Sequence, residues 1–273
     1  MTLSSPIIAL RPGCARLVVE KQGPQSVCIS SLSAAPIRLL VPTAAGLAVW
    51  AYLTGFGGGV VAGDRYEVTV EVGAGARLHV GTSGSTRVYR SNGPWSEVSN
   101  RLDVASDALA VWACDPLAAF AQCRVRQDQR INVAEGASLV WIDGLTAGRS
   151  ANGERWAGTV RSHLAIDVAG QPWLRDGVRL DPDAAVRFAP YNAVTLVALV
   201  GPLVAPLATA LVAEVAARPV VAGASLLVTA TARPGGAVLR LAGIAQELVD
   251  RELHALLRPL TALLGGDPWA RRP

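Results

Sequence analysis

Val70-Glu-Val-Gly-Ala-Gly-Ala-Arg-Leu-His-Val80 is the first of three similar segments that decide the fold of this 273-residue chain. The pattern returns in Leu102-Asp-Val-Ala-Ser-Asp-Ala-Leu-Ala-Val-Trp112 and in Ile131-Asn-Val-Ala-Glu-Gly-Ala-Ser-Leu-Val-Trp141, at spacings of 32 and then 29 residues. Each segment joins two alternating apolar runs through a turn of small or acidic residues, as strand pairs do. Repeats of this period indicate units that stack and bury their faces, so we expect a mainly β fold of stacked, β-solenoid-like strand layers. The alternative is a set of unrelated hairpins with similar turns.

A glycine-rich loop at residues 55–63 precedes the first repeat unit. Gly57, Gly59 and Ala62 formally fit the G-x-G-x-x-[GA] fingerprint, but that motif needs a helix after its glycines, so that the helix amides meet a pyrophosphate. Here Asp64 and an alternating, strand-like run follow instead, and no Lys-Ser/Thr pair makes a P-loop. We therefore interpret the loop as a strand connection whose glycines give it a specified shape.

The sequence predicts two parts within one continuous domain. Residues 1–190 hold the repeats and further strand-like runs, so we expect them to form the stacked β scaffold. Residues 191–273 predict a strand, a helix, a hairpin and a helix, a small C-terminal α/β portion with about two helices packed on the scaffold. The last of these helices is expected over residues 244–264, where leucines recur at helical spacing.

Residues 193–213 are uncharged and long enough to cross a membrane. Gly201, Pro202 and Pro206 interrupt this stretch, so a buried strand at residues 193–200 and an amphipathic helix at residues 203–217 are the favoured interpretation. We expect no membrane contact.

Composition narrows the classes of partner. The apolar content of 51% suffices for a core, and the net charge is +4, with arginines spread along the chain and Lys21 its only lysine. No basic cluster suggests nucleic-acid binding. Arginine favours bidentate pairing and protein interfaces, which points to a protein partner. Met1 is not followed by a signal-peptide pattern and the four cysteines lack Cys-x-x-Cys spacing, so we expect reduced thiols in the cytoplasm.

The chain shows no catalytic constellation. His79, His163 and His254 share no spacing, and none of the common hydrolase or zinc motifs occurs. Asp64, Asp143 and Glu154 are expected in glycine-rich loops, where carboxylates either bind a hard metal or orient backbone amides. Without a cluster of histidines and cysteines, we expect weak metal binding at most. Cys114 and Cys123 are expected to be buried structural thiols.

Three motifs lie beside the repeats. Residues 57–64 are Gly-Gly-Gly-Val-Val-Ala-Gly-Asp, and residues 82–91 are Thr-Ser-Gly-Ser-Thr-Arg-Val-Tyr-Arg-Ser. Residues 143–156 are Asp-Gly-Leu-Thr-Ala-Gly-Arg-Ser-Ala-Asn-Gly-Glu-Arg-Trp. These segments match the patterns G-G-x-x-x-G-D, a threonine-rich loop ending in K-V-Y-R-S, and D-x-x-x-x-G-R-x-A-x-G-E. Over roughly residues 40–176 the chain therefore resembles the urease accessory protein family UreD, called UreH in some bacteria.

The resemblance implies a non-enzymatic role. UreD-type proteins are mostly β, bind UreF and through it the GTPase UreG, and dock on apo-urease to help deliver nickel; an internal passage for nickel has been proposed. It implies UreF-type and UreG-type accessory proteins and apo-urease subunits as partners, no catalytic residues, and no tightly bound cofactor beyond nickel in transit. The candidate binding residues that it indicates are Gly58, Gly59, Asp64, Arg87, Tyr89, Arg90, Gly148, Arg149 and Glu154.

The chain departs from the family pattern in one segment. Trp112-Ala-Cys-Asp-Pro116 keeps only the tryptophan and the second proline of W-L-P-x-P, and Phe120-Ala-Gln-Cys123 replaces F-x-G-A. Arg87 stands where the family has lysine. If this segment contacts a partner or lines a passage, partner choice or ion handling differs here.

Two other functions are weighed against the accessory role. A metal-dependent enzyme would use the loop carboxylates Asp64 or Glu154. A β-solenoid adhesion module would need export, which the absence of a signal-peptide pattern disfavours.

Overall fold

The repeat segments build the stack of this computed structural model, which describes residues 10–43 and 46–270. Each segment joins a strand of one sheet to a strand of the other through a corner of small residues: β5 (Arg65–Val72) to β6 (Arg77–Thr82), β8 (Ser96–Val104) to β9 (Leu109–Trp112), and β11 (Arg124–Val133) to β12 (Ser138–Thr146). Equivalent positions of the repeats lie side by side, since Leu102 pairs with Val70 and with Ile131. Leu78, Ala110 and Leu139 do the same in the facing sheet. The predicted β-solenoid-like stack is confirmed.

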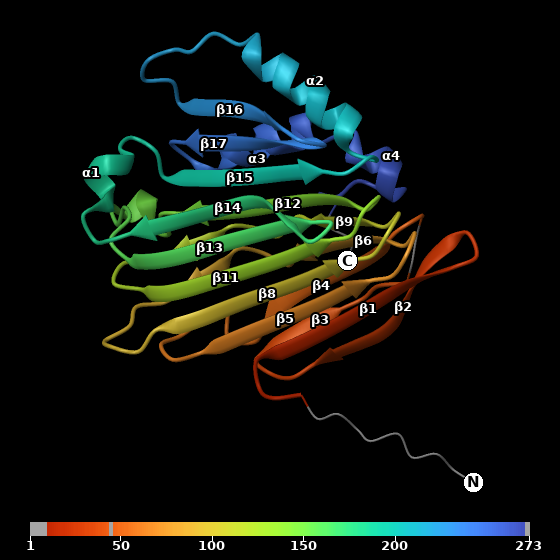
Figure 1. Ribbon diagram of the computed structural model, residues 1–273. Coiled ribbons are helices and arrows are strands. Elements are labelled where there is room, and N and C mark those ends of the chain that lie inside the picture. Colours follow the sequence, from red (N-terminus) through yellow and green to blue (C-terminus); the bar gives the residue numbers. More distant parts are fainter. Residues whose placement is uncertain (1–9, 44–45, 271–273) are drawn as a thin grey trace.

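Two sheets face each other (Figure 1). Sheet A has the order β14-β13-β11-β8-β5-β1-β2, with β1 (Cys14–Gln22), β2 (Gln25–Ser33), β13 (Thr159–Val168) and β14 (Gln171–Leu180). Sheet B has the order β16-β17-β15-β12-β9-β6-β4-β3, with β3 (Ile37–Leu40), β4 (Val49–Gly55), β15 (Ala193–Val200), β16 (Leu226–Arg233) and β17 (Gly236–Gly243). Two short strands, β7 (Thr86–Val88) and β10 (Leu117–Ala119), attach beside β12. The stacked strands run parallel, and antiparallel strands close both ends of each sheet.

Sheet B is covered on both faces, whereas sheet A is covered on one. The inner faces of the two sheets enclose the main core, to which Leu17, Leu102 and Trp141 belong. A second core packs the outer face of sheet B against α2 (Ala205–Ala216), α3 (Gln246–Leu256) and α4 (Leu260–Leu264). The outer face of sheet A bears charged residues, because its strands alternate apolar inward and polar outward.

The C-terminal part differs from the prediction in its helices. The strand at residues 193–200 and the helix after Gly201 are confirmed by β15 and α2, and β16 and β17 form the predicted hairpin. The single helix predicted over residues 244–264 is wrong: α3 ends at Leu256 and α4 begins at Leu260, because Pro259 cannot continue a helix. The described residues after 190 therefore hold three helices rather than two.

No helix in the described part of the chain has the length and apolarity to cross a membrane. The short elements α1 (Ala184–Phe188) and η1 (Ser150–Asn152) lie in connections between strands. All of β15 pairs with β12, so sheet B continues across residue 190. The division into two parts at that residue stays a prediction.

Candidate functional site

The glycine loop is fixed against the segment that follows β6. Val60 donates its backbone N–H to the carbonyl of Arg87 at 2.7 Å, and Tyr89 N–H returns a bond to the carbonyl of Val60 at 2.9 Å. A Cβ atom at Gly59 would lie 2.3 Å from the Arg87 carbonyl oxygen, so only glycine fits there. Asp64 Oδ2 accepts the N–H of Val61 at 3.0 Å, which confirms that this carboxylate orients the loop backbone. Strand β5 follows directly, without a helix, as predicted.

The third motif reaches the same place through Phe120. Tyr89 packs edge-on against the Phe120 ring, with 5.5 Å between centroids, and the guanidinium of Arg149 lies 5.1 Å above the same ring. A Cβ at Gly148 would lie 2.7 Å from that ring. The tyrosine hydroxyl also reaches the carbonyl of Gly58 at 3.4 Å. Tyr89, Gly148 and Arg149 thus contact one phenylalanine, and Tyr89 connects it to Gly58 and Gly59 of the glycine loop.

The other predicted site residues are more scattered. Arg87 and Arg90 are exposed, and Arg90 forms an isolated backbone bridge with Cys123. Glu154 lies in a loop that its neighbour Arg155 ties to Asn192 at 2.7 Å. Asp64 and Glu154 precede β5 and β13, which are three strand spacings apart in sheet A, about 14 Å. These two carboxylates, either of which the enzyme alternative would use, therefore lie apart, and that alternative stays untested.

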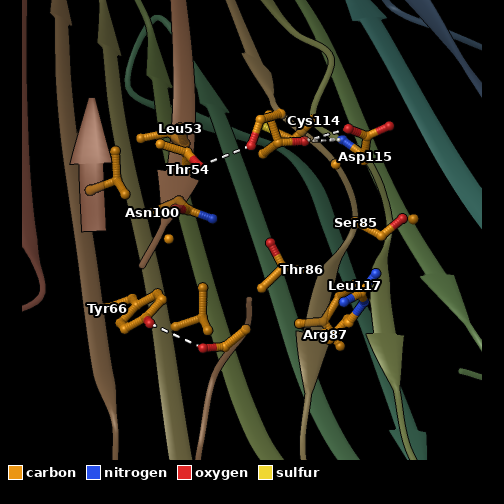
Figure 2. A pocket seen from close by; sticks show the side chains of 18 of the residues that line it. Leu53, Thr54, Tyr66, Ser85, Thr86, Arg87, Asn100, Cys114, Asp115 and Leu117 are labelled. Carbon is orange, nitrogen blue, oxygen red and sulfur yellow. Dashed lines mark hydrogen bonds between the residues drawn. The ribbon is translucent and has the colours of Figure 1, made fainter. Parts of the chain in front are cut away.

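A cavity of about 270 Å³ lies between the two sheets, next to this loop cluster. Figure 2 shows Asn100 of β8 on one wall of this inner cavity and Arg87 on the opposite wall. The lining mixes apolar residues with many polar ones, among them Thr82, Asn100, Asp115, Gln127, Gln129 and Asp143. A cavity with polar walls at the centre of a β stack is a place for water or a small polar solute.

The carboxyl group of Asp143 dominates the electrostatics of the inner cavity. Because it is enclosed by protein, burial raises its pKa to about 6. Gln129 and Gln127 oppose this rise, and Gln127 Nε2 donates to Asp143 Oδ1 at 3.4 Å. Within the described residues, Gln127 Oε1 has no hydrogen-bond partner, although Gln127 is only 8% exposed. The cavity therefore offers a polar atom that a solute can satisfy.

Most of the residues that line the inner cavity are not among the binding residues predicted from the sequence. Asp143 was expected in a glycine-rich loop but lies within β12. Gln127 and Gln129 occupy inward positions of β11, in the same alternation as the apolar Ile131. Polar residues at the inward positions of an alternating strand are the sequence feature that could have indicated a polar cavity inside the stack.

The cysteines and metal ligands can now be placed. All four cysteines are free thiols; Cys123 is fully buried as expected, whereas Cys114 lines the cavity, where burial raises its thiol pKa well above the usual range. Among the described residues, no group of three or more histidine, cysteine, aspartate or glutamate side chains is placed to hold a metal ion. Weak nickel binding stays a prediction.

Comparison with known proteins shows which protein family this chain resembles. The family described as UreD urease accessory protein matches residues 11–273. A urease accessory protein UreD of Anaeromyxobacter sp. (strain Fw109-5) is 34% identical over 98% of this chain and 92% of its own length. A urease accessory protein UreD of Sorangium cellulosum (strain So ce56) is 37% identical over 96% of this chain and 85% of its own length. A urease accessory protein D of Oryza sativa subsp. indica is 34% identical over 67% of this chain and 63% of its own length.

Proposed function

The chain belongs to the UreD family of urease accessory proteins, and on this basis we propose that it acts as a scaffold that helps deliver nickel to apo-urease. In this proposal it works with UreF-type and UreG-type accessory proteins, carries out no catalysis itself, and holds nickel only in transit.

The inner cavity is the observation that carries this proposal. Carboxylate, amide and hydroxyl oxygens line it, and such ligands suit divalent cations. Asp143 has a pKa of about 6, so at neutral pH its carboxylate is available to an arriving cation, at the cost of holding a charge in a buried place. A carboxylate that is poorly compensated by protein groups favours the cation that neutralises it.

We place partner docking at the loop cluster around Phe120, which consists of residues 57–64, 82–91 and 148–154. Its exposed side chains include Phe56 beside the glycine loop and the guanidinium groups of Arg87 and Arg90. Aromatic and arginine side chains are enriched at protein interfaces. The strands of the stack hold these loops, and residues 58, 59 and 82–87 of the cluster also form part of the cavity wall.

Deletion of the gene in a urease-producing host tests the function directly. We expect urease subunits that assemble but are inactive and poor in nickel, with activity and nickel content restored by the wild-type gene. Active, nickel-replete urease in the deletion strain would reject the proposal.

Complementation with two variants tests the role of the cavity. Asp143→Leu should fail to restore activity, because it removes the carboxylate of the inner cavity. Asp128→Asn is the matched control, since Asp128 lies on the outward face of β11, adjacent to Gln127 and Gln129 in sequence, and should restore activity fully. Equal rescue by both variants would show that nickel does not depend on this cavity.

A further inference from the structure

A row of arginines crosses the outer face of sheet A, a surface that the proposed function does not use. Arg126 of β11 is the register partner of Arg161 in β13, and Arg161 is the partner of Arg179 in β14. All three occupy outward positions of their strands, which lie side by side (Figure 1). Adjacent strands are about 4.8 Å apart, so like charges stand next to one another, an arrangement that is unfavourable unless opposite charge is supplied.

Trp95, which directly precedes β8, packs against one end of this row. The guanidinium carbons of Arg124 and Arg126 lie 4.9 and 4.6 Å from the centroid of its indole ring. Arg124 also donates to the backbone carbonyl of Gly93 at 2.7 Å. Contact with an aromatic face orients a guanidinium group and leaves its N–H donors free to bind a partner. We use the name arginine face for five residues: Trp95, Arg124, Arg126, Arg161 and Arg179.

One carboxylate serves the two arginines at the far end of the row. Asp181 accepts from Arg161 at 2.6 Å and from Arg179 at 3.1 Å. Arg161 also donates to the backbone carbonyls of residues 160 and 180, so its side chain is held against the sheet. The side chain of Arg179 stays 74% exposed. Two guanidinium groups therefore share one negative charge, and one of the two remains accessible.

The two arginines beside Trp95 have no carboxylate of their own. Glu97 of β8 is the register partner of Arg126, but it pairs with Arg65 on the other side at 3.3 Å. In the described part of the chain, neither Arg124 nor Arg126 forms an ion pair. The positive charge of this end of the row is therefore uncompensated.

The same face is balanced nearer the corners. Arginines and carboxylates neutralise one another there in three ion pairs: Arg16 with Glu71, Arg130 with Asp128, and Arg175 with Asp167. Such pairs are usual for a solvated β surface and leave little charge for a partner. The excess of positive charge on sheet A is thus concentrated at the loop end.

We propose that the arginine face binds an acidic segment of a partner protein, whose aspartate and glutamate side chains supply the opposite charge. Guanidinium groups bind carboxylates in a bidentate manner, and arginine and tryptophan dominate the binding energy of many protein interfaces. The face adjoins the loop cluster, because Arg90 of that cluster forms a backbone bridge with Cys123, the residue before Arg124. That the partner is an accessory protein or apo-urease rests on the proposed function, whereas its acidic chemistry rests on the charges of this face.

A nucleic acid fits this face less well than a protein segment does. Glu97 and Asp128 lie beside Arg126, and Asp181 lies beyond Arg179. A phosphate backbone that continued past the arginines would meet these carboxylates, because its charges are evenly spaced along the strand. A short acidic segment avoids them.

Fluorescence anisotropy of a labelled oligoglutamate peptide tests the proposal on the purified full-length chain. We expect binding at low ionic strength that weakens as salt is added, because exposed charges are screened by salt. An oligoglutamine peptide of the same length should not bind. A labelled single-stranded oligodeoxythymidylate of equal charge should bind more weakly than oligoglutamate does.

Variants locate the binding on the face. Arg126→Gln should raise the Kd for oligoglutamate about fivefold, because it removes one exposed charge pair. Arg101→Gln is the matched control and should leave the Kd unchanged: Arg101 is also exposed, at an outward position of β8 on the same face, and its loss changes the net charge equally. Trp95→Leu should raise the Kd about threefold, because it releases both guanidinium groups. Arg126→Lys keeps the charge without the planar fork and should bind more weakly than wild type.

Four outcomes would overturn the inference. They are no binding of oligoglutamate at low ionic strength, DNA binding as tight as peptide binding, wild-type affinity in Arg126→Gln, and an equal loss in Arg101→Gln, which would indicate attraction by net charge alone. Thermal unfolding reports whether each variant remains folded, and Arg126→Gln changes only an exposed side chain. Failure of the proposed function appears separately, as active urease in the deletion strain, and would leave the peptide titration unaffected.

Discussion

The two ends of the β stack have the same backbone arrangement, but one end has an apolar interior and the other has polar side chains inside it. Near the corners, one inward ladder of sheet A is Val70, Leu102, Ile131 and Ile166. Two residues towards the loop cluster, the equivalent ladder is Val68, Asn100, Gln129 and Leu164. The first ladder is packed entirely in the apolar core, whereas the second places Asn100 and Gln129 on the wall of the inner cavity, between the core residues Val68 and Leu164. The corner end is therefore the more tightly packed and stabilising part of the stack, whereas the loop end is less tightly packed and holds polar groups inside.

The largest effect on stability is expected at the corner end. Ile131→Ala removes a side chain that is 1% exposed, and should lower the free energy of unfolding by about 2–5 kcal/mol through lost burial and the space left behind. Thermal or urea unfolding of the purified accessory complex measures it. A loss below about 1 kcal/mol would mean that the corner end is not tightly packed, which would break the comparison.

The next effect concerns Asp143 and pH. Its pKa rises from 3.8 to about 6 on folding, so between these values the folded chain keeps a proton that the unfolded chain releases. Stability therefore falls as pH rises through this window, and the full penalty, at most about 3 kcal/mol, applies above it. Asp143→Asn should be more stable than wild type at neutral pH and lack this decline. Unfolding curves at pH 4.5 and 7.5 decide the sign; equal pH dependence in both proteins would contradict it.

Gln129→Leu sharpens the contrast between stability and function. Leucine at this inward position resembles the corner ladder, so the free energy of unfolding should change by less than about 1 kcal/mol or increase. Nickel content of urease in the complemented strain should nevertheless fall, because the polar lining is lost. Gln129→Asn keeps an amide side chain and is the control. Full nickel loading with leucine would show that this wall does not matter.

The most local effect is expected at Asp64. Its carboxylate accepts one exposed backbone N–H, so Asp64→Ala should cost about 1 kcal/mol and loosen residues 57–64. Partner binding should weaken while the cavity stays intact. Asp64→Asn retains the acceptor and should behave as wild type; pull-down of the accessory partners compares the two.

Much of the fold was accessible from the sequence, because it depends on period and spacing. The three repeats predicted the stack. The alignment of Val70, Leu102 and Ile131 in the repeats is also the strand register, because the inward alternation and the equal length of the corners allow only one pairing of the strands. The glycine-loop motif and the role of Asp64 followed from local chemistry. Pro259 separates α3 from α4, although the leucine spacing by itself predicts one helix across it.

Tertiary structure alone decided where the inner cavity lies. A buried glutamine in one strand is satisfied, crowded or left facing a space according to the side-chain volumes of the strands on either side, and no single segment contains that information. His79 and His254 likewise share a cavity only because α3 packs on the outer face of sheet B. Sequence periodicity therefore determined which residues point inward, and packing between distant segments determined where the interior stayed open.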